Sequence, residues 1–271
     1  MSKIEIANYI IENKKIPYDF NDYVIVQITD LHNKSFGENN IYLTREIDKI
    51  NPQVVFITGD LIDGENKNFK VALDLLKYLT NKYKVYYITG NHEQKALLKK
   101  YKELYKEYFE KLNDLSGVHL DNEKIQITKG NSHINLYGLT IPFKCYKYLL
   151  DKNKNIDLEK DFLQKNLPQI NRSEYNILLV HTPFYFDEYE KWGADLILAG
   201  HVHGGIIRLP FIGGLLSPNR HFFPKYDLGK YDKNDSTMIV SKGLGESKVL
   251  VRINCKPEVV KITLKSKYCN E

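Results

Sequence analysis

Five short polar blocks in the sequence carry the residue types that could do metal chemistry. Each block follows a strand-like apolar run. The blocks are Asp30-Leu31-His32, Gly59-Asp60, Gly90-Asn91-His92-Glu93, His181 and Gly200-His201-Val202-His203. Their carboxylate, amide and imidazole groups form a mixed oxygen and nitrogen ligand set without sulfur, which suits Mn²⁺, Fe²⁺ or Zn²⁺. Two such ions in one site are typical of enzymes that hydrolyse phosphate esters.

The predicted site holds two divalent ions with negative charge between them. Ions about 3.5–4 Å apart repel strongly, so a bridging carboxylate and a bridging hydroxide must offset their charge. Asp60 is the predicted bridging carboxylate. The remaining ligands are assigned as two sets, namely Asp30, His32 and His203 for one ion and Asn91, His181 and His201 for the other. Both ions lower the pKa of the water between them, so the resulting hydroxide is the expected nucleophile.

Two further residues beside the ligands are candidates for direct contact with the substrate. His92 follows the ligand Asn91 but points elsewhere, so it is free to protonate the leaving oxygen or to stabilise charge on phosphorus. The alternative is that His92 only orients a ligand. Asn33 follows the ligand His32, and its amide either donates a hydrogen bond to a bound phosphate or caps the turn.

Alternating strands and helices must position these blocks. Apolar runs at 24–29, 54–58 and 85–89 are each followed by a polar block and then by a helical pattern, as in a mostly buried α/β sheet. Helices are predicted over 41–50, 68–79 and 95–112. Further strands are predicted over 134–139, 177–180, 196–199, 238–240, 249–253 and 259–264. No repeat or linker interrupts this order, so a single domain over 1–271 is expected.

Composition narrows the class of protein and its partners. The chain has 271 residues with 39 basic and 34 acidic side chains, a net charge of +5 that is too mild to predict nucleic-acid binding. Cys145, Cys255 and Cys269 fit no metal-ligand spacing and favour a reducing, cytoplasmic location. The first 15 residues lack the apolar core of a signal peptide, and no apolar run approaches the ~20 residues of a membrane span. Peripheral membrane contact stays open.

The order of the blocks resembles that of the calcineurin-like metallophosphoesterases. The family pattern is D-x-H, G-D, G-N-H-E/D, a lone His and G-H-x-H, and this chain matches each element in order. The resemblance implies an α/β protein with a four-layer α/β/β/α sandwich. It also implies a phosphoesterase site with two metal ions, held by the residues assigned above.

Further segments resemble the bacterial YkuE/YaeI-like branch of this family. They are Gly204-Gly205-Ile206-Ile207-Arg208-Leu209-Pro210, Phe223-Pro224-Lys225-Tyr226, Lys242-Gly243-Leu244-Gly245 and Arg252-Ile253-Asn254. Members of the branch often begin with a membrane anchor or an export signal, and related lipid-active enzymes cleave the pyrophosphate of UDP-diacylglucosamine. This chain shows no such anchor, so the cytoplasm is the expected location.

The segment 206–223 gives the main sequence indication of substrate. It is rich in Ile, Leu and Phe and directly follows the last pair of candidate ligands. One interpretation is a β-hairpin packed into the core. The other is an apolar lip that admits acyl chains or touches a bilayer, with Arg208 and Arg220 available to bind phosphate. The second interpretation favours a lipid-linked phosphoester or pyrophosphate as substrate.

Three functions are compatible with these residues. The first is hydrolysis of a phosphodiester or pyrophosphate bond by a metal-bridging hydroxide, because each ligand and the candidate acid His92 are present. The second is hydrolysis of a phosphomonoester. The third is a non-catalytic scaffold with a metallophosphoesterase fold, in which the ligands would be expected to be eroded.

Overall fold

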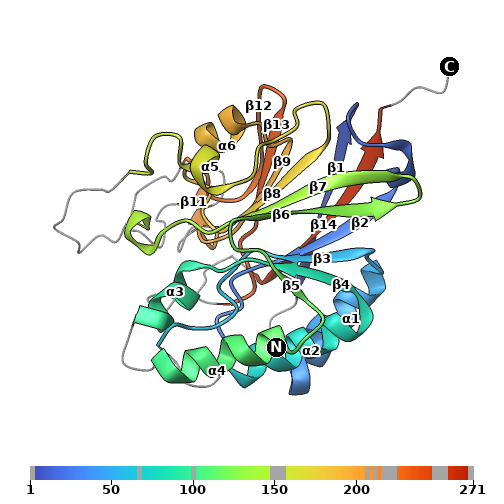
Figure 1. Cartoon of the computed structure of the whole chain (residues 1–271). Helices are drawn as coiled ribbons and strands as arrows, with labels where there is room; N and C mark the ends of the chain where they lie inside the picture. Colours follow the sequence, from blue (N-terminus) through green and yellow to red (C-terminus); the bar gives the residue numbers. More distant parts are fainter. Residues whose placement is uncertain are drawn as a thin grey trace.

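Two six-stranded β-sheets pack face to face between outer layers of helices (Figure 1). The computed structural model describes residues 4–65, 69–98, 102–146, 157–204, 208–209, 213–214, 225–245 and 256–267. The architecture is a four-layer α/β/β/α sandwich, which confirms the fold class predicted from the sequence. That the whole of 1–271 forms one domain stays a prediction.

The first sheet runs in the order β1-β14-β2-β3-β4-β5. Its strands are β1 (Glu5–Asn13), β14 (Glu258–Ser266), β2 (Tyr23–Ile28), β3 (Val54–Ile57), β4 (Lys84–Tyr87) and β5 (Val118–His119). The outer face of this sheet carries α1 (Ile41–Ile50), α2 (Lys70–Lys82) and α4 (Lys102–Asn113) (Figure 1). The short helix α3 (Asn91–Leu98) follows β4 directly.

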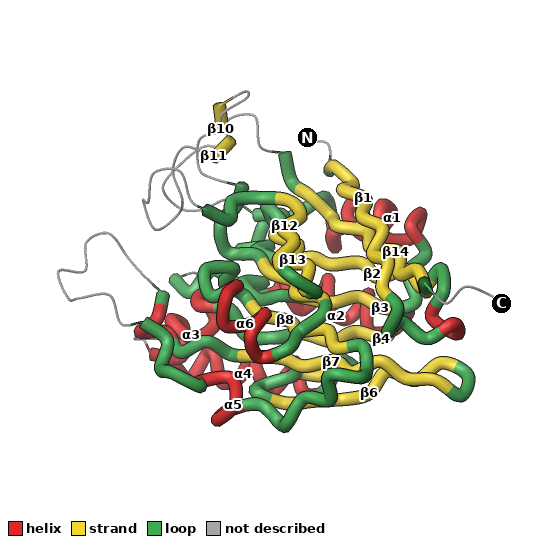
Figure 2. Tube along the Cα trace, turned by 90° about the horizontal axis from the view of Figure 1, so that it is seen from above, coloured by secondary structure: helices red, strands yellow, loops and turns green. Residues whose placement is uncertain are grey.

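The second sheet runs in the order β12-β13-β9-β8-β7-β6. Its strands are β12 (Gly229–Lys233), β13 (Ser236–Val240), β9 (Leu196–Ala199), β8 (Asn176–Val180), β7 (Ser132–Leu139) and β6 (Glu123–Lys129). Helices α5 (Phe162–Asn166) and α6 (Phe186–Trp192) lie over its outer face (Figures 1 and 2). A small ladder of β10 (Arg208–Leu209) and β11 (Gly213–Gly214) stands apart from both sheets.

The central strands of both sheets are parallel. In the first sheet β3 pairs in parallel with β2 and β4, and in the second sheet β8 pairs in parallel with β7 and β9. Parallel strands of one sheet end at the same edge, where ligand sites of open α/β sheets form. The polar blocks that follow these strands are therefore brought to one edge of each sheet.

Alternate residues of a central strand pack into different cores. In β3, Val55 and Ile57 pack toward the helices, whereas Val54 and Phe56 pack toward the second sheet. This alternation explains why the run reads as continuously apolar, because both faces of the strand are buried. A third core fills the space between the second sheet and α6, where Tyr137 meets the Trp192 ring edge-on.

Most predicted elements are present with small shifts of their ends. The helix over 41–50 and the strand over 196–199 coincide with α1 and β9. The single helix predicted over 95–112 is wrong in its bounds, because α3 already begins at Asn91 and α4 begins at Lys102. The strand predicted over 249–253 lies outside the described residues. Within the described part of the chain, no helix combines the length and the apolar character needed to cross a membrane.

Candidate metal centre

The loops after five strands bring the predicted ligands together. Asp30 and His32 follow β2, Asp60 follows β3, and Asn91 begins α3 after β4. From the second sheet, His181 follows β8, and His201 and His203 follow β9. Asp30, Asp60, Asn91 and the histidines 181, 201 and 203 are each at most 5% exposed. The candidate centre therefore lies at the joint edge of the two sheets and is nearly closed to solvent.

One group of possible ligands consists of Asp30, His32 and His203. The Asp30 Oδ1 atom lies 3.7 Å from His32 Nε2 and 3.4 Å from His203 Nε2. The two Nε2 atoms of the histidines are 3.2 Å apart. Two nitrogens and one carboxylate oxygen thus converge on one point, as the sequence assignment for the first ion requires.

A second group consists of Asp60, His181 and His201. The Asp60 Oδ2 atom lies 3.0 Å from His181 Nε2 and 3.8 Å from His32 Nε2, so this carboxylate faces histidines of both groups. Asp60 also belongs to a third possible group, with His32 and His92. Its central position is the geometry that a bridging carboxylate requires.

Asn91 reaches this region through the first turn of α3. The backbone N–H of its neighbour His92 donates to Asp60 Oδ1 at 2.8 Å, which fixes the start of the helix against the central carboxylate. The Asn91 side chain is buried at this point, 2% exposed. The roles of all seven residues as ligands stay a prediction, for which this arrangement gives the geometric support.

Hydrogen bonds behind the ligands fix their orientation. His181 Nδ1 donates to the Thr58 backbone carbonyl at 2.6 Å, so in the neutral imidazole Nε2 carries only a lone pair. That lone pair faces the Asp60 carboxylate oxygen at 3.0 Å, and two acceptors at this distance repel. A cation between them, or a second proton on the ring, removes the repulsion. The donor set therefore fits a metal ion.

Two buried polar atoms without a hydrogen-bond partner also fit a bound metal ion. Within the described residues, the buried Asp30 Oδ1 and His201 Nε2 atoms make no hydrogen bond. Buried acceptors without a partner are costly, by about 1–3 kcal/mol each, so native proteins rarely keep them without reason. A divalent ion bound by these atoms would satisfy both.

Burial and the charges of the cluster shift the pKa values of its side chains in different directions. Burial alone would lower the pKa of His181, but the Asp60 and Asp30 carboxylates outweigh it and raise the pKa to about 10. Burial, helped by the charge of His181, lowers the pKa of His201 to about 3, so this ring is neutral and able to bind metal. For Asp60, burial is outweighed by His181 and His92, which hold its pKa well below the usual range.

The backbone at the cluster adopts a conformation that few residues tolerate. Five candidate ligands have positive φ values, namely Asp30 (52°), His32 (48°), Asp60 (53°), His201 (71°) and His203 (54°). Among residues other than glycine, Asp, Asn and His enter this left-handed region most readily. The chain thus turns sharply after each strand, and the residue types of the ligands suit these turns.

Glycines allow the loops of the two sheets to approach one another. A side chain at Gly90 would collide with the Asp60 carboxylate and backbone, and one at Gly200 would collide with Thr29 and Asp30. Gly59 has φ of 91°, and a Cβ there would lie 2.9 Å from His181 Nδ1. The glycines of the sequence blocks therefore leave room for the candidate ligands to pack closely.

Glu93 holds the loops of the first sheet in place. It is 4% exposed, and its carboxylate accepts backbone N–H bonds from Asp60 and Gly90 at 2.9 Å and from Ile62 at 3.2 Å. Burial and the negative charge of Asp60 raise the pKa of Glu93 to about 7. The sequence placed Glu93 in the block Gly90-Asn91-His92-Glu93 but gave no indication of these three bonds.

Removing the Glu93 side chain should therefore destabilise the fold. We expect Glu93→Ala to lower the free energy of unfolding of metal-free protein by about 3–5 kcal/mol, because three buried donors lose their acceptor. Urea denaturation measures the change. The matched control is Glu103→Ala on α4, which removes an exposed glutamate paired with Lys106 and should change stability by less than about 0.5 kcal/mol. Equal effects of the two substitutions would contradict the interpretation.

His92 lies at the rim of the cluster and is held by its own loop. The Gly64 backbone N–H donates to His92 Nδ1 at 3.2 Å, and the Asp63 Oδ1 atom lies 3.6 Å from the same nitrogen. The His92 side chain is 20% exposed, and its ring centroid is 4.5 Å from that of His32. His92 thus reaches both solvent and the candidate ligands.

The structure describes only some of the other residues that were predicted to contact the substrate. Asn33 has φ of 57°, and within the described residues its buried amide oxygen and nitrogen make no hydrogen bond. Arg208 belongs to strand β10, but its side chain lies outside the described part. Arg220 and most of the segment 206–223 also lie outside the described residues. Their assigned roles stay predictions.

Aromatic rings complete the wall beside the second group of candidate ligands, a feature absent from the sequence blocks. The ring centroids of Tyr146 and Phe184 lie 5.1 Å and 6.0 Å from that of His201, and both rings approach it edge-on. The sequence gives one indication of such a contact, which is that Phe184 follows the predicted ligand His181 by three residues.

The family and the fold are established by comparison with known proteins. Residues 23–205 match the family model of the calcineurin-like phosphoesterases. The metallophosphoesterase YkuE of Bacillus subtilis is 27% identical over 97% of this chain and 86% of its own length. The metallophosphoesterase Cj0846 of Campylobacter jejuni is 31% identical over 93% of this chain, which spans 62% of that longer protein.

A solved structure shows the same fold at lower sequence similarity. The phosphopantetheinyl hydrolase of Mycobacterium tuberculosis superposes with a TM-score of 0.51 at 11% identity, covering 84% of this chain and 91% of that protein. Together with the family match and the clustered carboxylates and histidines, the comparisons settle the family. The chain belongs to the calcineurin-like phosphoesterases, in their YkuE-like branch, and is a metal-dependent phosphoesterase.

Proposed function

We propose that the chain hydrolyses a phosphodiester or pyrophosphate bond with two divalent ions, of Mn²⁺, Fe²⁺ or Zn²⁺ type. The observation that carries the proposal is the position of Asp60, whose Oδ2 atom lies within 3.8 Å of histidines from both ligand groups. A carboxylate shared in this way is what a site for two ions requires. Nitrogen and carboxylate donors without sulfur favour the three metals named.

The residues divide into ligands and groups that act on the substrate. Asp30, His32 and His203 would hold one ion, Asn91, His181 and His201 the other, and Asp60 both. Ions bound here supply Lewis-acid activation of water and of the phosphoryl group. The backbone carbonyl of Thr58 keeps His181 in the tautomer that presents Nε2 to the site.

His92 is the proposed general acid. Its Nδ1 atom accepts a hydrogen bond from the Gly64 backbone, so the neutral ring carries its proton on Nε2. To act as an acid the ring must carry protons on both nitrogens, with the Gly64 bond to Nδ1 given up. It then transfers the Nε2 proton to the oxygen of the leaving group, which would otherwise depart as an alkoxide, and returns to the neutral form with its Nδ1 proton facing the Asp63 carboxylate 3.6 Å away.

Hydrolysis of either a diester or a monoester releases an alkoxide that needs a proton, and His92 at the exposed side of the cluster is placed to supply it. The choice of diester over monoester is therefore the part of the proposal that the two model substrates below decide. The scaffold alternative is disfavoured because the seven predicted ligands and His92 are all present in the chain. Hydrolysis of a lipid-linked substrate, with membrane contact through 206–223, remains our proposal from the apolar sequence of that segment.

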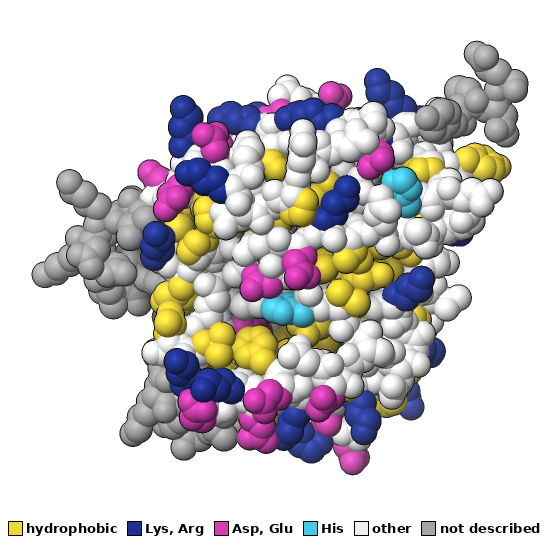
Figure 3. Space-filling view, in the orientation of Figure 1, with side chains coloured by type: hydrophobic (Ala, Val, Ile, Leu, Met, Phe, Trp, Pro, Cys, Tyr) yellow, Lys and Arg dark blue, Asp and Glu magenta, His cyan; other side chains and the backbone are white. Residues whose placement is uncertain are grey.

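The face of the molecule seen in Figure 3 suits a small substrate better than a polyanion. On the face shown in Figure 3, Lys and Arg side chains are dispersed and alternate with Asp and Glu. Nucleic-acid binding draws on continuous basic patches, which raise affinity through many phosphate contacts. This dispersion supports our expectation that nucleic acid is not the substrate.

Metal analysis combined with two model substrates tests the proposal. With two equivalents of Mn²⁺ per chain, hydrolysis of bis(p-nitrophenyl) phosphate should exceed that of p-nitrophenyl phosphate in kcat/KM by about tenfold or more, or ~1.4 kcal/mol in the barrier. Preference for the monoester would favour the phosphomonoesterase. Two bound ions with no hydrolysis of either ester would favour the scaffold.

A further inference from the structure

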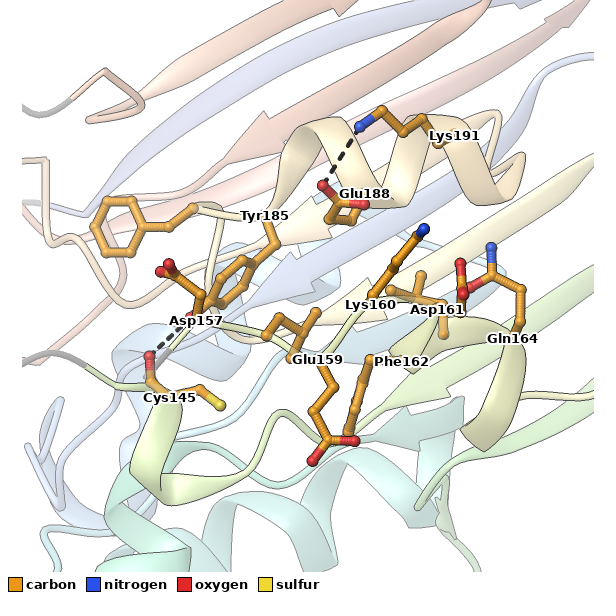
Figure 4. A pocket seen from close by; sticks show the side chains of 13 residues that line it. Cys145, Asp157, Glu159, Lys160, Asp161, Phe162, Gln164, Tyr185, Glu188 and Lys191 are labelled. Carbon is orange, nitrogen blue, oxygen red and sulfur yellow. Dashed lines mark hydrogen bonds and ion pairs between the residues drawn. The ribbon is translucent and has the colours of Figure 1, made fainter. Parts of the chain in front are cut away.

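We propose that a pocket beside the metal cluster holds the organic group esterified to the phosphate and selects a positively charged, amine-bearing group. The inference rests on the proposed phosphodiesterase function and adds the class of substrate. The pocket has a volume of about 840 Å³ and lies between α6 and the segment 157–164, which contains the start of α5 (Figure 4). This volume is in the range of sites for small organic molecules.

The pocket adjoins the candidate metal centre through its aromatic wall. Phe184 lines the pocket, and its ring lies 6.0 Å from that of His201 between the centroids. Cys145 also lines it and directly precedes Tyr146, whose ring lies 5.1 Å from His201. A group attached to a phosphate at the metals would therefore meet this wall first.

Apolar and aromatic side chains form part of the lining of the pocket. Phe162, Leu163, Phe184 and Tyr185 contribute to it, and Leu163 is buried. The Tyr185 hydroxyl donates to the Cys145 carbonyl at 2.9 Å, so this polar tip is already used within the protein (Figure 4). Its ring is left as an apolar surface. Such a surface accepts methyl and methylene groups in preference to water.

Acidic side chains surround this apolar surface. Four carboxylates line the pocket, namely those of Asp157, Glu159, Asp161 and Glu188, against the two ammonium groups of Lys160 and Lys191. Lys191 is 3.5 Å from Glu188 and Lys144 is 4.0 Å from Glu159, so two of the four carboxylates have a lysine partner, and the four carboxylates still exceed the three ammonium groups (Figure 4). Aromatic faces together with surplus carboxylates attract a cation and repel a second anion. A substituent that ends in a carboxylate or a further phosphate is therefore disfavoured.

Three p-nitrophenyl phosphodiesters separate the effects of charge and size. Their second ester group is choline, its uncharged isostere 3,3-dimethylbutanol, or methyl, which is too short to fill the pocket. We expect kcat/KM for the choline ester to exceed that for the dimethylbutyl ester about three- to tenfold at low salt, and the difference to shrink as salt screens the exposed carboxylates. Equal values for all three esters would overturn the inference.

A matched pair of charge reversals locates the effect. Glu188→Lys should abolish the preference for choline over dimethylbutyl. The control Glu46→Lys alters a glutamate of α1 that, like Glu188, pairs with a lysine three residues later. It lies on the helix layer of the other sheet and should keep the preference. Retention of the preference in Glu188→Lys would contradict the proposal.

A binding measurement on metal-free protein distinguishes failure of the pocket from failure of the catalytic proposal. In two-dimensional NMR spectra, choline should shift resonances of residues 157–164 and 184–191 more than 3,3-dimethylbutanol does. Shifts confined to other residues would overturn the pocket inference. If the metal-loaded protein fails to hydrolyse the methyl ester while these shifts are seen, the catalytic proposal fails and the pocket assignment stands.

Discussion

Asp60→Asn protein should bind fewer than two divalent ions per chain and hydrolyse bis(p-nitrophenyl) phosphate about 10³-fold more slowly, a loss of about 4 kcal/mol in transition-state stabilisation. The substitution keeps the shape of the side chain but removes its charge. The Asp60 Oδ2 atom lies 3.0 Å from His181 Nε2 and 3.8 Å from His32 Nε2, and it is closer to the second group than the Asp30 Oδ1 atom, which is 3.9 Å from His181 Nε2. Two ions would then repel each other with less compensation.

Metal content and turnover, measured on the same preparation, test this expectation. The matched control is Asp48→Asn, which neutralises a carboxylate of α1 that accepts hydrogen bonds from Tyr78 and Tyr83. Because Asp48 lies on the outer helix layer, this variant should keep both ions and its activity. Two bound ions and near-normal turnover in Asp60→Asn would contradict the bridging role.

His92→Ala should keep both ions and yet lose about 10²–10⁴-fold in kcat, the usual contribution of a general acid. The loss should be smaller for a p-nitrophenolate leaving group, which needs no proton, than for an alkoxide leaving group. Kinetics with a p-nitrophenyl ester and an alkyl ester of matched size measure this difference. The control His133→Ala removes a partly exposed histidine beside Glu174 and should leave both rates unchanged.

Two results would revise the role of His92. Equal losses for both leaving groups would restrict it to orientation or to stabilisation of charge. Loss of a metal ion would make His92 a ligand, since it lies with His32 and Asp60 in one possible ligand group. Metal analysis of the variant therefore accompanies its kinetics.

The layered fold and the clustering of the candidate ligands could be predicted because both follow from two local rules. Continuous apolar runs such as 54–58 indicate strands buried on both faces, and the end of each parallel strand falls at one edge of a sheet. Asp60 and His181 follow such runs directly, so their convergence required no knowledge of the loops. The geometry supports the predicted ligand sets, whose function the metal analyses above would test.

Other features depend on contacts that the local pattern does not contain. The edge strand β1 was missed because its exposed residues, such as Ile10 at 62%, blur the apolar pattern. The start of α3 at Asn91 was missed because the apolar spacing that set the bounds of the predicted helix begins only at 95. The two bonds from Asp60 and Ile62 to Glu93 and the rim of the pocket join segments that lie far apart in the chain, so no local spacing could predict them.

The division of the candidate ligands between the two sheets sets an order for assembly. The first sheet alone presents two aspartates, one histidine and one asparagine, and the second presents only three histidines. Neither half offers both complete sets, so high-affinity metal binding must wait until the halves have docked. Metal bound by ligands from both halves would link the two sheets across their interface, and its binding free energy would count toward docking. Uptake of metal would then report completion of the fold.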